Sequence, residues 1–267
     1  MAMRDEIKEQ TIKWKDMNRK EKWGYFWEYY KIHVIVTVIV IIAVTSIIHA
    51  VVTDKPYAFY GMMINAMVLD GSSVEEDFSK YAEIDAGTYD CFIDTTSTLS
   101  LTSSSEYELA TAQKLIALVQ TKELDVVTIN SSLFSNYAGN EMFADLRTVM
   151  TGEELAAYGD NIYYVDSASF DSVEDETEDI SAEVVVPTQE EIEADAEAHR
   201  YPEDMSDPIP VGIFLNDAAF ITSSGCYSSD MIPVAGISVA CERPDTAVTF
   251  IQYLWETSFD RETGSAY

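Results

Sequence analysis

Hydrophobic and polar positions follow two different patterns along this chain. Residues 32–52 form one uninterrupted apolar run, IHVIVTVIVIIAVTSIIHAVV, which has 21 residues and no Asp, Glu, Lys or Arg. After residue 57, short apolar runs alternate with stretches in which apolar residues recur every three or four positions. The first pattern predicts a membrane-spanning helix, and the second predicts strands and amphipathic helices in turn.

The apolar run is long enough to cross a bilayer, because a helix of this length spans about 30 Å, the thickness of the hydrocarbon core. A cleavable signal peptide is the competing interpretation. Its apolar region usually has only about 7–15 residues and ends at a small-residue cleavage site. We therefore expect an uncleaved transmembrane helix over residues 32–52.

The residues before the run predict its orientation. Residues 1–31 contain eight of the 16 Lys and Arg residues but only six of the 47 Asp and Glu residues. Because positive residues accumulate on the cytoplasmic side, we expect a short cytoplasmic segment over 1–31 and the remainder outside a plasma membrane. Aromatic rings beside a lysine suit the headgroup layer. The expected membrane-interface residues are Trp23, Tyr25, Phe26, Trp27, Tyr29, Tyr30 and Lys31.

Strand-like and helix-like segments alternate from residue 57 onward. This order predicts βαβ units, a mostly parallel sheet and an α/β fold. We expect a first part over 57–166, with return strands and a C-terminal helix of the same domain over 209–260. The expected strands are YAFYGMMINAMV (57–68), YDCFIDT (89–95), LDVVTI (124–129), IYYV (162–165), IPVGIFL (209–215) and IPVAGISVAC (232–241).

Capping boxes and apolar periodicity predict the helices between these strands. The expected boxes are Ser72 with Glu75, Ser105 with Glu108, and Thr151 with Glu154. The expected mostly apolar faces are Val74, Phe78 and Tyr81; then Leu109, Ala112, Gln113, Ile116 and Val119; and, after Pro244, Ala247, Ile251 and Leu254.

The stretch from residue 160 to 208 differs from its surroundings, because it contains 17 Asp and Glu residues and one Arg. No EF-hand spacing occurs in it, so the sequence gives no metal site there. Such composition is typical of a solvated, poorly ordered segment. We expect an acidic insertion over 167–208, within which EIEADAEAHR is compatible with a short helix.

Composition and motifs exclude several classes of function. The net charge of −31 opposes binding to nucleic acid. The three histidines lie in the apolar run (His33 and His49) or in the acidic stretch (His199), and no GxSxG, GxxxxGK[ST], HExxH or GxGxxG motif occurs. We therefore expect no catalytic residues, no cofactor and no enzymatic activity.

Three cysteines are present, and no CxxC or zinc spacing occurs among them. Cys91 lies in an apolar run and is expected to be buried. Cys226 and Cys241 either form a disulfide or remain thiols, because connectivity does not follow from spacing.

Polar residues gather where the expected strands end. Open α/β sheets bind ligands at the carboxyl ends of their strands, so these residues are candidate ligand contacts. The alternative is that each only caps a helix or forms a turn. The candidates are Asp70, Ser72, Thr95, Asn130, Ser131, Ser132, Tyr137, Asn216 and Asp217.

Several segments resemble type 2 extracytoplasmic solute-binding proteins. LDVVTINSSLFSNYAGNEMFADL matches that family's strand, polar turn, helix and G-x-F-x-DL exit, with two extra residues between Gly139 and Phe143. PVGIFL resembles its return strand, and its P-x-x-A-x-x-F-x-x-x-L helix is carried by Pro244, Ala247, Phe250 and Leu254. The resemblance covers residues 57–258 in patches.

The resemblance implies a periplasmic-binding-protein type 2-like lobe in a Gram-positive bacterium. The family's second lobe usually occurs where this chain has its acidic stretch, so the resemblance implies a reduced or absent second lobe. Two functions remain open. One is a membrane-anchored solute-binding receptor or accessory subunit of a transport system. The other is an interaction or scaffold protein that keeps the fold without a small ligand and contacts other membrane or cell-surface proteins.

Overall fold

The computed structural model describes residues 18–53, 55–67, 69–101, 105–168, 187–260 and 263–266. The chain divides into two compact units, Met1–Lys55 and Pro56–Tyr267. The second unit is called the α/β domain below.

The first unit contains one long helix, α2 (Arg19–Thr53). Its stretch Tyr30–Ile48 has 19 residues and a mean hydropathy of 2.5, so length and composition would let it cross a membrane. A signal sequence near the N-terminus has the same properties. Phe26 stacks on Trp23 and on Tyr30, which places these expected interface residues along one helix face. The side chains of Tyr25 and Tyr29 lie outside the described part.

A mixed sheet forms the centre of the α/β domain. Its strand order is β2-β1-β3-β6-β5-β4. β1 pairs in parallel with β2 and β3, whereas β6 is antiparallel to β3 and β5, and β4 is antiparallel to β5. Four strands therefore point the same way, as expected for a mostly parallel sheet, and β4 and β6 oppose them. The strands are β1 Tyr57–Met63, β2 Asp90–Asp94, β3 Val126–Asn130, β4 Ile162–Asp166, β5 Pro208–Phe214 and β6 Pro233–Ile237.

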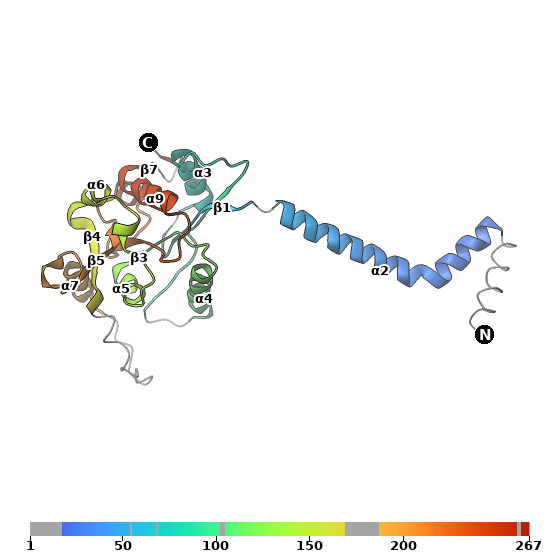
Figure 1. Ribbon diagram of the computed structural model, residues 1–267, viewed down its shortest axis with the longest axis horizontal. Helices are drawn as coiled ribbons and strands as arrows, with labels where there is room; N and C mark the ends of the chain where they lie inside the picture. Colours follow the sequence, from blue (N-terminus) through green and yellow to red (C-terminus); the bar gives the residue numbers. More distant parts are fainter. Residues whose placement is uncertain are drawn as a thin grey trace, which may run out of the picture. The chain divides into compact units, whose positions relative to one another are not determined.

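Helices cover both faces of the sheet, with α3, α6 and α9 on one side and α4, α5 and α7 on the other (Figure 1). Alternate residues of each strand supply the two cores; in β1, Phe59 and Met63 face α3 and α9, while Tyr60 and Met62 face α4 and α5. The helices are α3 Gly71–Tyr81, α4 Glu106–Gln120, α5 Ser131–Gly139, α6 Gly152–Ala156, α7 Gln189–Ala198, α8 Ala219–Ser224 and α9 Pro244–Glu256, and the short hairpin strands are β7 Phe259–Asp260 and β8 Ser265–Ala266.

Two of the three expected capping boxes are confirmed, and the first is wrong. Ser105 with Glu108 and Thr151 with Glu154 cap α4 and α6. At α3 the N-cap is instead Asp70, whose carboxylate accepts a hydrogen bond from the backbone of Ser72. Glu75 accepts from the backbone N–H of Ile93 in β2 at 2.9 Å, so it is not available for a box with Ser72.

The apolar face expected for α4 is not the buried one. Leu109 and Ile116 are 58% and 54% exposed. The buried row is Thr111, Leu115 and Leu118, which packs on the sheet. α4 carries apolar residues around most of its circumference, so periodicity alone did not identify the face that meets the core.

Residues 187–208 were expected to be part of a poorly ordered acidic insertion, but they contain a helix that packs on the domain. A capping box of Thr188 with Glu191 starts α7, and Ala196 is buried. His199 stacks on Tyr163 with ring centroids 4.4 Å apart, and its carbonyl accepts from the Tyr164 N–H. These contacts hold α7 on β4. Residues 169–186 lie outside the described residues.

The three cysteines are thiols, so Cys226 and Cys241 do not form a disulfide. Cys241 lies beside the fully buried Asp125 at the start of β3 and donates to its carboxylate at 3.2 Å. Arg243 also donates to Asp125, as does the Tyr60 N–H. The Cys241 thiol thus belongs to a polar cluster that joins β1, β3 and the start of α9.

Candidate functional site

The carboxyl ends of β1, β2, β3 and β5 meet at one edge of the sheet, since these strands share a direction. A pocket of about 320 Å³ lies at this edge, and we call it the edge pocket. The residues after β1, β2 and β3 line it, together with α7 and the loop before β6. Its lining residues are Asn65, Leu99, Ser100, Leu101, Asn130, Ser132, Leu133, Pro187, Ile192 and Met231.

Asn65 connects the end of β1 to the loop after β2. Its side chain donates to the Leu99 carbonyl at 2.8 Å and accepts from the Leu99 N–H at 3.0 Å. Its own N–H donates to the Ser97 carbonyl. Asn65 has φ +64°, a left-handed conformation that asparagine tolerates better than most residues. Asn65 therefore fixes one wall of the edge pocket.

The same loop is held at its start by Asp94. The Asp94 carboxylate accepts from the Lys114 ammonium of α4 at 2.7 Å and from the Thr96 N–H at 2.8 Å. It also accepts from the Ser97 hydroxyl. Burial would raise the pKa of Asp94, but these hydrogen bonds outweigh burial and hold the pKa below its usual range. Asp94 therefore stays ionised and keeps the loop in place.

Asn130 and Ser132 form the second wall, at the end of β3. The Asn130 side chain accepts from the Ile232 N–H at 2.9 Å and donates to the Ser132 hydroxyl oxygen at 3.0 Å. Asn130 makes no side-chain cap on α5. It instead joins the end of β3 to the loop before β6. Ser132 is the acceptor in this pair, so its O–H remains available as a donor.

The third wall comes from the acidic stretch. Pro187 and Ile192 line the edge pocket from the start of α7, and α7 packs beside α5 on this face of the sheet. The position of α7 depends on the β4 contacts of His199. The segment that was expected to be a poorly ordered insertion therefore supplies a wall opposite the loop at Leu99–Leu101.

The described lining of the edge pocket contains polar and apolar residues but no charged ones. Asn65, Ser100, Asn130 and Ser132 supply amide and hydroxyl groups, and the other six described lining residues are apolar. A few convergent polar groups on an apolar wall are typical of small-molecule sites. None of these ten residues is charged, so they offer a charged ligand no ion-pair partner.

The structure brings together only some of the nine candidate residues from the sequence. Asn130 and Ser132 line the edge pocket. Ser131 is fully buried, and its hydroxyl has no partner among the described residues. Thr95 is buried and donates to the Leu69 carbonyl. The remaining candidates, which do not line the edge pocket, are Asp70, Ser72, Tyr137, Asn216 and Asp217.

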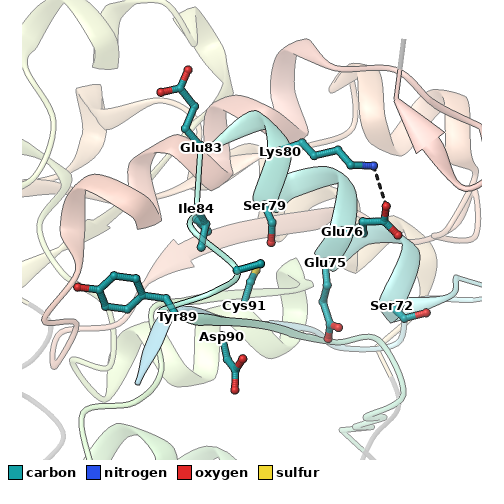
Figure 2. A pocket seen from close by; sticks show the side chains of 11 residues that line it. Ser72, Glu75, Glu76, Ser79, Lys80, Glu83, Ile84, Tyr89, Asp90 and Cys91 are labelled. Atoms are coloured by element: carbon teal, nitrogen blue, oxygen red, sulfur yellow. Dashed lines mark hydrogen bonds and ion pairs between the residues drawn. The ribbon is translucent and has the colours of Figure 1, made fainter. Parts of the chain in front are cut away.

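Two of these residues lie at other depressions of the α/β domain. Tyr137 lines an apolar groove of about 400 Å³ between α4 and the loop after α5, with Ile116, Met142 and Val239. Ser72 lines a third depression, of about 580 Å³, between α3 and the start of β2 (Figure 2). Asp70 caps α3, and the buried Asn216 side-chain oxygen has no partner among the described residues.

The sequence interpretation missed Asn65, Pro187 and Ile192. Asn65 stands inside an apolar run that was expected to continue as a strand to residue 68, whereas β1 ends at Met63. An asparagine between a buried strand and a helix start was the available signal. For Pro187 and Ile192, the sequence of Thr188 and Glu191 gave a capping box that predicts α7.

Comparison with known proteins gives no match. No protein-family model, curated protein or solved structure is similar to this chain at a significant level.

Proposed function

We propose that this protein is a membrane-anchored, non-enzymatic solute-binding protein whose α/β domain takes a small uncharged molecule in the edge pocket. The observation that carries the proposal is the position and lining of that pocket. It lies at the carboxyl ends of parallel strands, where open α/β sheets bind their ligands, and two of its three walls carry polar groups beside apolar ones. The resemblance to type 2 solute-binding proteins supports the same role.

The proposed anchor is α2, with the N-terminus in the cytoplasm and the α/β domain outside the plasma membrane. The apolar stretch Tyr30–Ile48, the aromatic row at Trp23, Phe26 and Tyr30, and the basic segment before them support this orientation. A receptor or an accessory subunit of a transport system would hold its binding domain in this way.

The proposed ligand class follows from charge and size. The residues after the apolar run contain 41 of the 47 Asp and Glu residues and eight of the 16 Lys and Arg residues, a net charge of −33. Such a domain repels anions, and the described residues of the pocket lining offer no cation to pair with one. Sugars, polyols and nucleosides combine an uncharged polar edge with an apolar face, and they suit the amide and hydroxyl groups present.

A thermal-shift screen of the full chain in detergent tests the proposal. Compounds of these classes should raise the melting temperature by mass action, whereas phosphates and carboxylates should not. Ser132→Phe fills the pocket and should abolish the shift. Asn136→Phe, an exposed position one turn further along α5, should leave it unchanged. A panel without any stabilising compound, or a shift that survives Ser132→Phe, would contradict the proposal.

A second function, an interaction or scaffold protein, is favoured by the apolar groove beside α4. Ile116 and Val239 are exposed there, next to Val119, Tyr137 and Met142. An exposed apolar surface of this kind is typical of a protein contact. Crosslinking in intact membranes distinguishes the two functions. A scaffold should lose its partner on Ile116→Glu, and a solute-binding protein should keep its ligand-induced stabilisation.

A further inference from the structure

β2 lies at one edge of the six-stranded sheet. β2 is the last strand in the sheet order, and its second edge pairs with no strand in the part of the chain that the structure describes. The Asp90 N–H points toward β1, because it donates to the Pro56 carbonyl at 3.0 Å. The Ile93 N–H points outward, because it donates to Glu75 at 2.9 Å. Alternation along the strand therefore directs the Cys91 N–H outward as well.

The opposite edge of the sheet is already covered. At β4, the Tyr164 N–H donates to the His199 carbonyl, and the Asp166 carboxylate accepts from the N–H groups of Ser206 and Asp207. At the outer edge of β2, the hydrogen bond to the Ile93 N–H comes from a single side chain, that of Glu75, and not from a chain segment as at β4. The Glu75 carboxylate occupies the position that a carbonyl of an added strand would take.

A groove of about 580 Å³ runs beside this edge, between α3 and the start of β2. Figure 2 shows Glu75 and Ser79 pointing from α3 toward β2, with the Cys91 side chain beside them and Tyr89 and Asp90 at the border. Of β2, Asp90 and Cys91 line the groove, so it lies at the start of the strand's outer edge.

The charge of the groove selects its occupant. Four carboxylates line it, from Glu75, Glu76, Glu83 and Asp90. The one basic residue in the described lining is Lys80, and it forms an ion pair with Glu76 at 2.8 Å. The lining has a net charge of −3, which favours a basic partner and opposes a second copy of this acidic chain.

We propose that β2 binds a basic, extended peptide segment of another protein as an added strand. The backbone of that segment pairs with the outward groups of Cys91 and Ile93, and the Ile93 N–H exchanges Glu75 for a peptide carbonyl. Lys or Arg side chains of the segment then meet Glu75 and Glu83. In this mode main-chain hydrogen bonds give affinity, and side chains at alternate positions give specificity.

Fluorescence anisotropy with a labelled octapeptide of alternating Lys and Thr, added to the full chain in detergent, tests the proposal. Two N-methylated forms of the same peptide are the decisive controls, one methylated at every Lys amide and one at every Thr amide. Along a strand, the amides of alternate residues point to opposite edges, and an added strand pairs through only one of these edges. One N-methylated form should therefore bind about tenfold more weakly or worse, and the other should bind like the parent peptide. A peptide of alternating Glu and Thr should not bind.

Charge-reversal variants test the position of the site. Glu83→Lys with Asp90→Lys should weaken binding of the Lys-Thr peptide about tenfold. Glu203→Lys with Asp204→Lys makes the same change of charge in the exposed turn Pro202–Asp204. This control variant should bind the Lys-Thr peptide as tightly as the wild type does. Unchanged melting temperatures show that each variant is folded. Equal binding of both N-methylated forms, an equal effect of both charge reversals, or no binding of the parent would overturn the proposal. In those cases Glu75 only protects an edge strand from pairing.

Discussion

Single residues at the edge pocket connect segments that are far apart in the chain. Asn130 and Ser132 were expected at this edge, because a polar turn directly after a buried strand is visible in the sequence. The partner of Asn130, the Ile232 N–H, lies 102 positions away, and local patterns do not predict such a pair. The sequence did not predict Asn65 as a pocket residue for a related reason. Its role depends on a backbone conformation and on Leu99, and neither is encoded in the spacing of apolar residues.

Replacing Asn65 tests separately its hydrogen bonds to Leu99 and its left-handed backbone conformation. Asn65→Ala removes both hydrogen bonds to the Leu99 backbone and keeps a Cβ at φ +64°, where alanine is less tolerated than asparagine. We expect a loss of about 2 kcal/mol in the free energy of unfolding. Asn65→Gly removes the same bonds without the backbone strain, so it should lose about 1 kcal/mol less. Urea unfolding of the full chain, followed by near-UV circular dichroism, measures both values. Equal losses would show that the left-handed conformation is not strained.

The Asp94 to Lys114 pair gives a pH dependence of defined sign. The folded-state pKa of Asp94 lies below its unfolded value, so its stabilising contribution is complete above about pH 4 and is lost as the pH falls toward the folded pKa. Asp94→Asn lacks this contribution at every pH. The difference in unfolding free energy between wild type and Asp94→Asn should be about 2 kcal/mol at pH 7 and should shrink below pH 4. A difference that stays constant from pH 7 to pH 3 would contradict this account.

At the level of elements, periodicity located most of the strands and helices but did not always give their ends or their buried faces. β1 and β2 lie within the expected segments, β3 extends one residue beyond its segment, and α9 buries Ala247, Ile251 and Leu254 as expected. These elements have one strongly apolar face or an unbroken apolar run. α4 has neither, because its apolar residues Leu109, Leu115, Ile116 and Leu118 point in several directions. Only the position of the neighbouring sheet decides which of them is buried.

Two adjacent residues of α4 provide a matched test of that face. Leu115 is fully buried against the sheet, and Ile116 is exposed. Leu115→Ala should lower the free energy of unfolding by about 2–4 kcal/mol, through lost burial and a cavity. Ile116→Ala should change it by less than about 0.5 kcal/mol. Denaturation of both variants under the same conditions gives the comparison. The reverse order of effects would show that the face expected from the sequence is the buried one.

At the level of the whole molecule, the α/β class followed from the alternation of elements, whereas the strand order did not. β4 is antiparallel to β5, and β6 is antiparallel to β3 and β5, and the periodicity of single segments does not give these pairings. α7 adds a wall to the edge pocket from a stretch whose acidic composition suggested solvent exposure. Composition reports the average polarity of a segment, but a few contacts, such as those of His199 and Ala196, decide whether it packs.

The proposed membrane topology has a direct biochemical test. Protease added to intact cells should degrade the α/β domain, because the proposal puts it outside. An epitope tag on the N-terminus should remain protected until the cells are permeabilised. Alkaline carbonate should leave the full chain in the membrane fraction, since α2 is long enough to span the bilayer. Protection of the α/β domain in intact cells, or release of the chain by carbonate, would contradict the anchored orientation.

Ligand binding at the edge pocket is the central claim, and amide hydrogen exchange tests it most directly. The measurement compares the full chain with and without an uncharged compound that raises its melting temperature. The account predicts slower exchange in the three walls of the pocket, at residues 97–101, 130–133 and 187–192. Unchanged exchange in these walls, or protection confined to the apolar groove at residues 116–120 and 137–142, would contradict it.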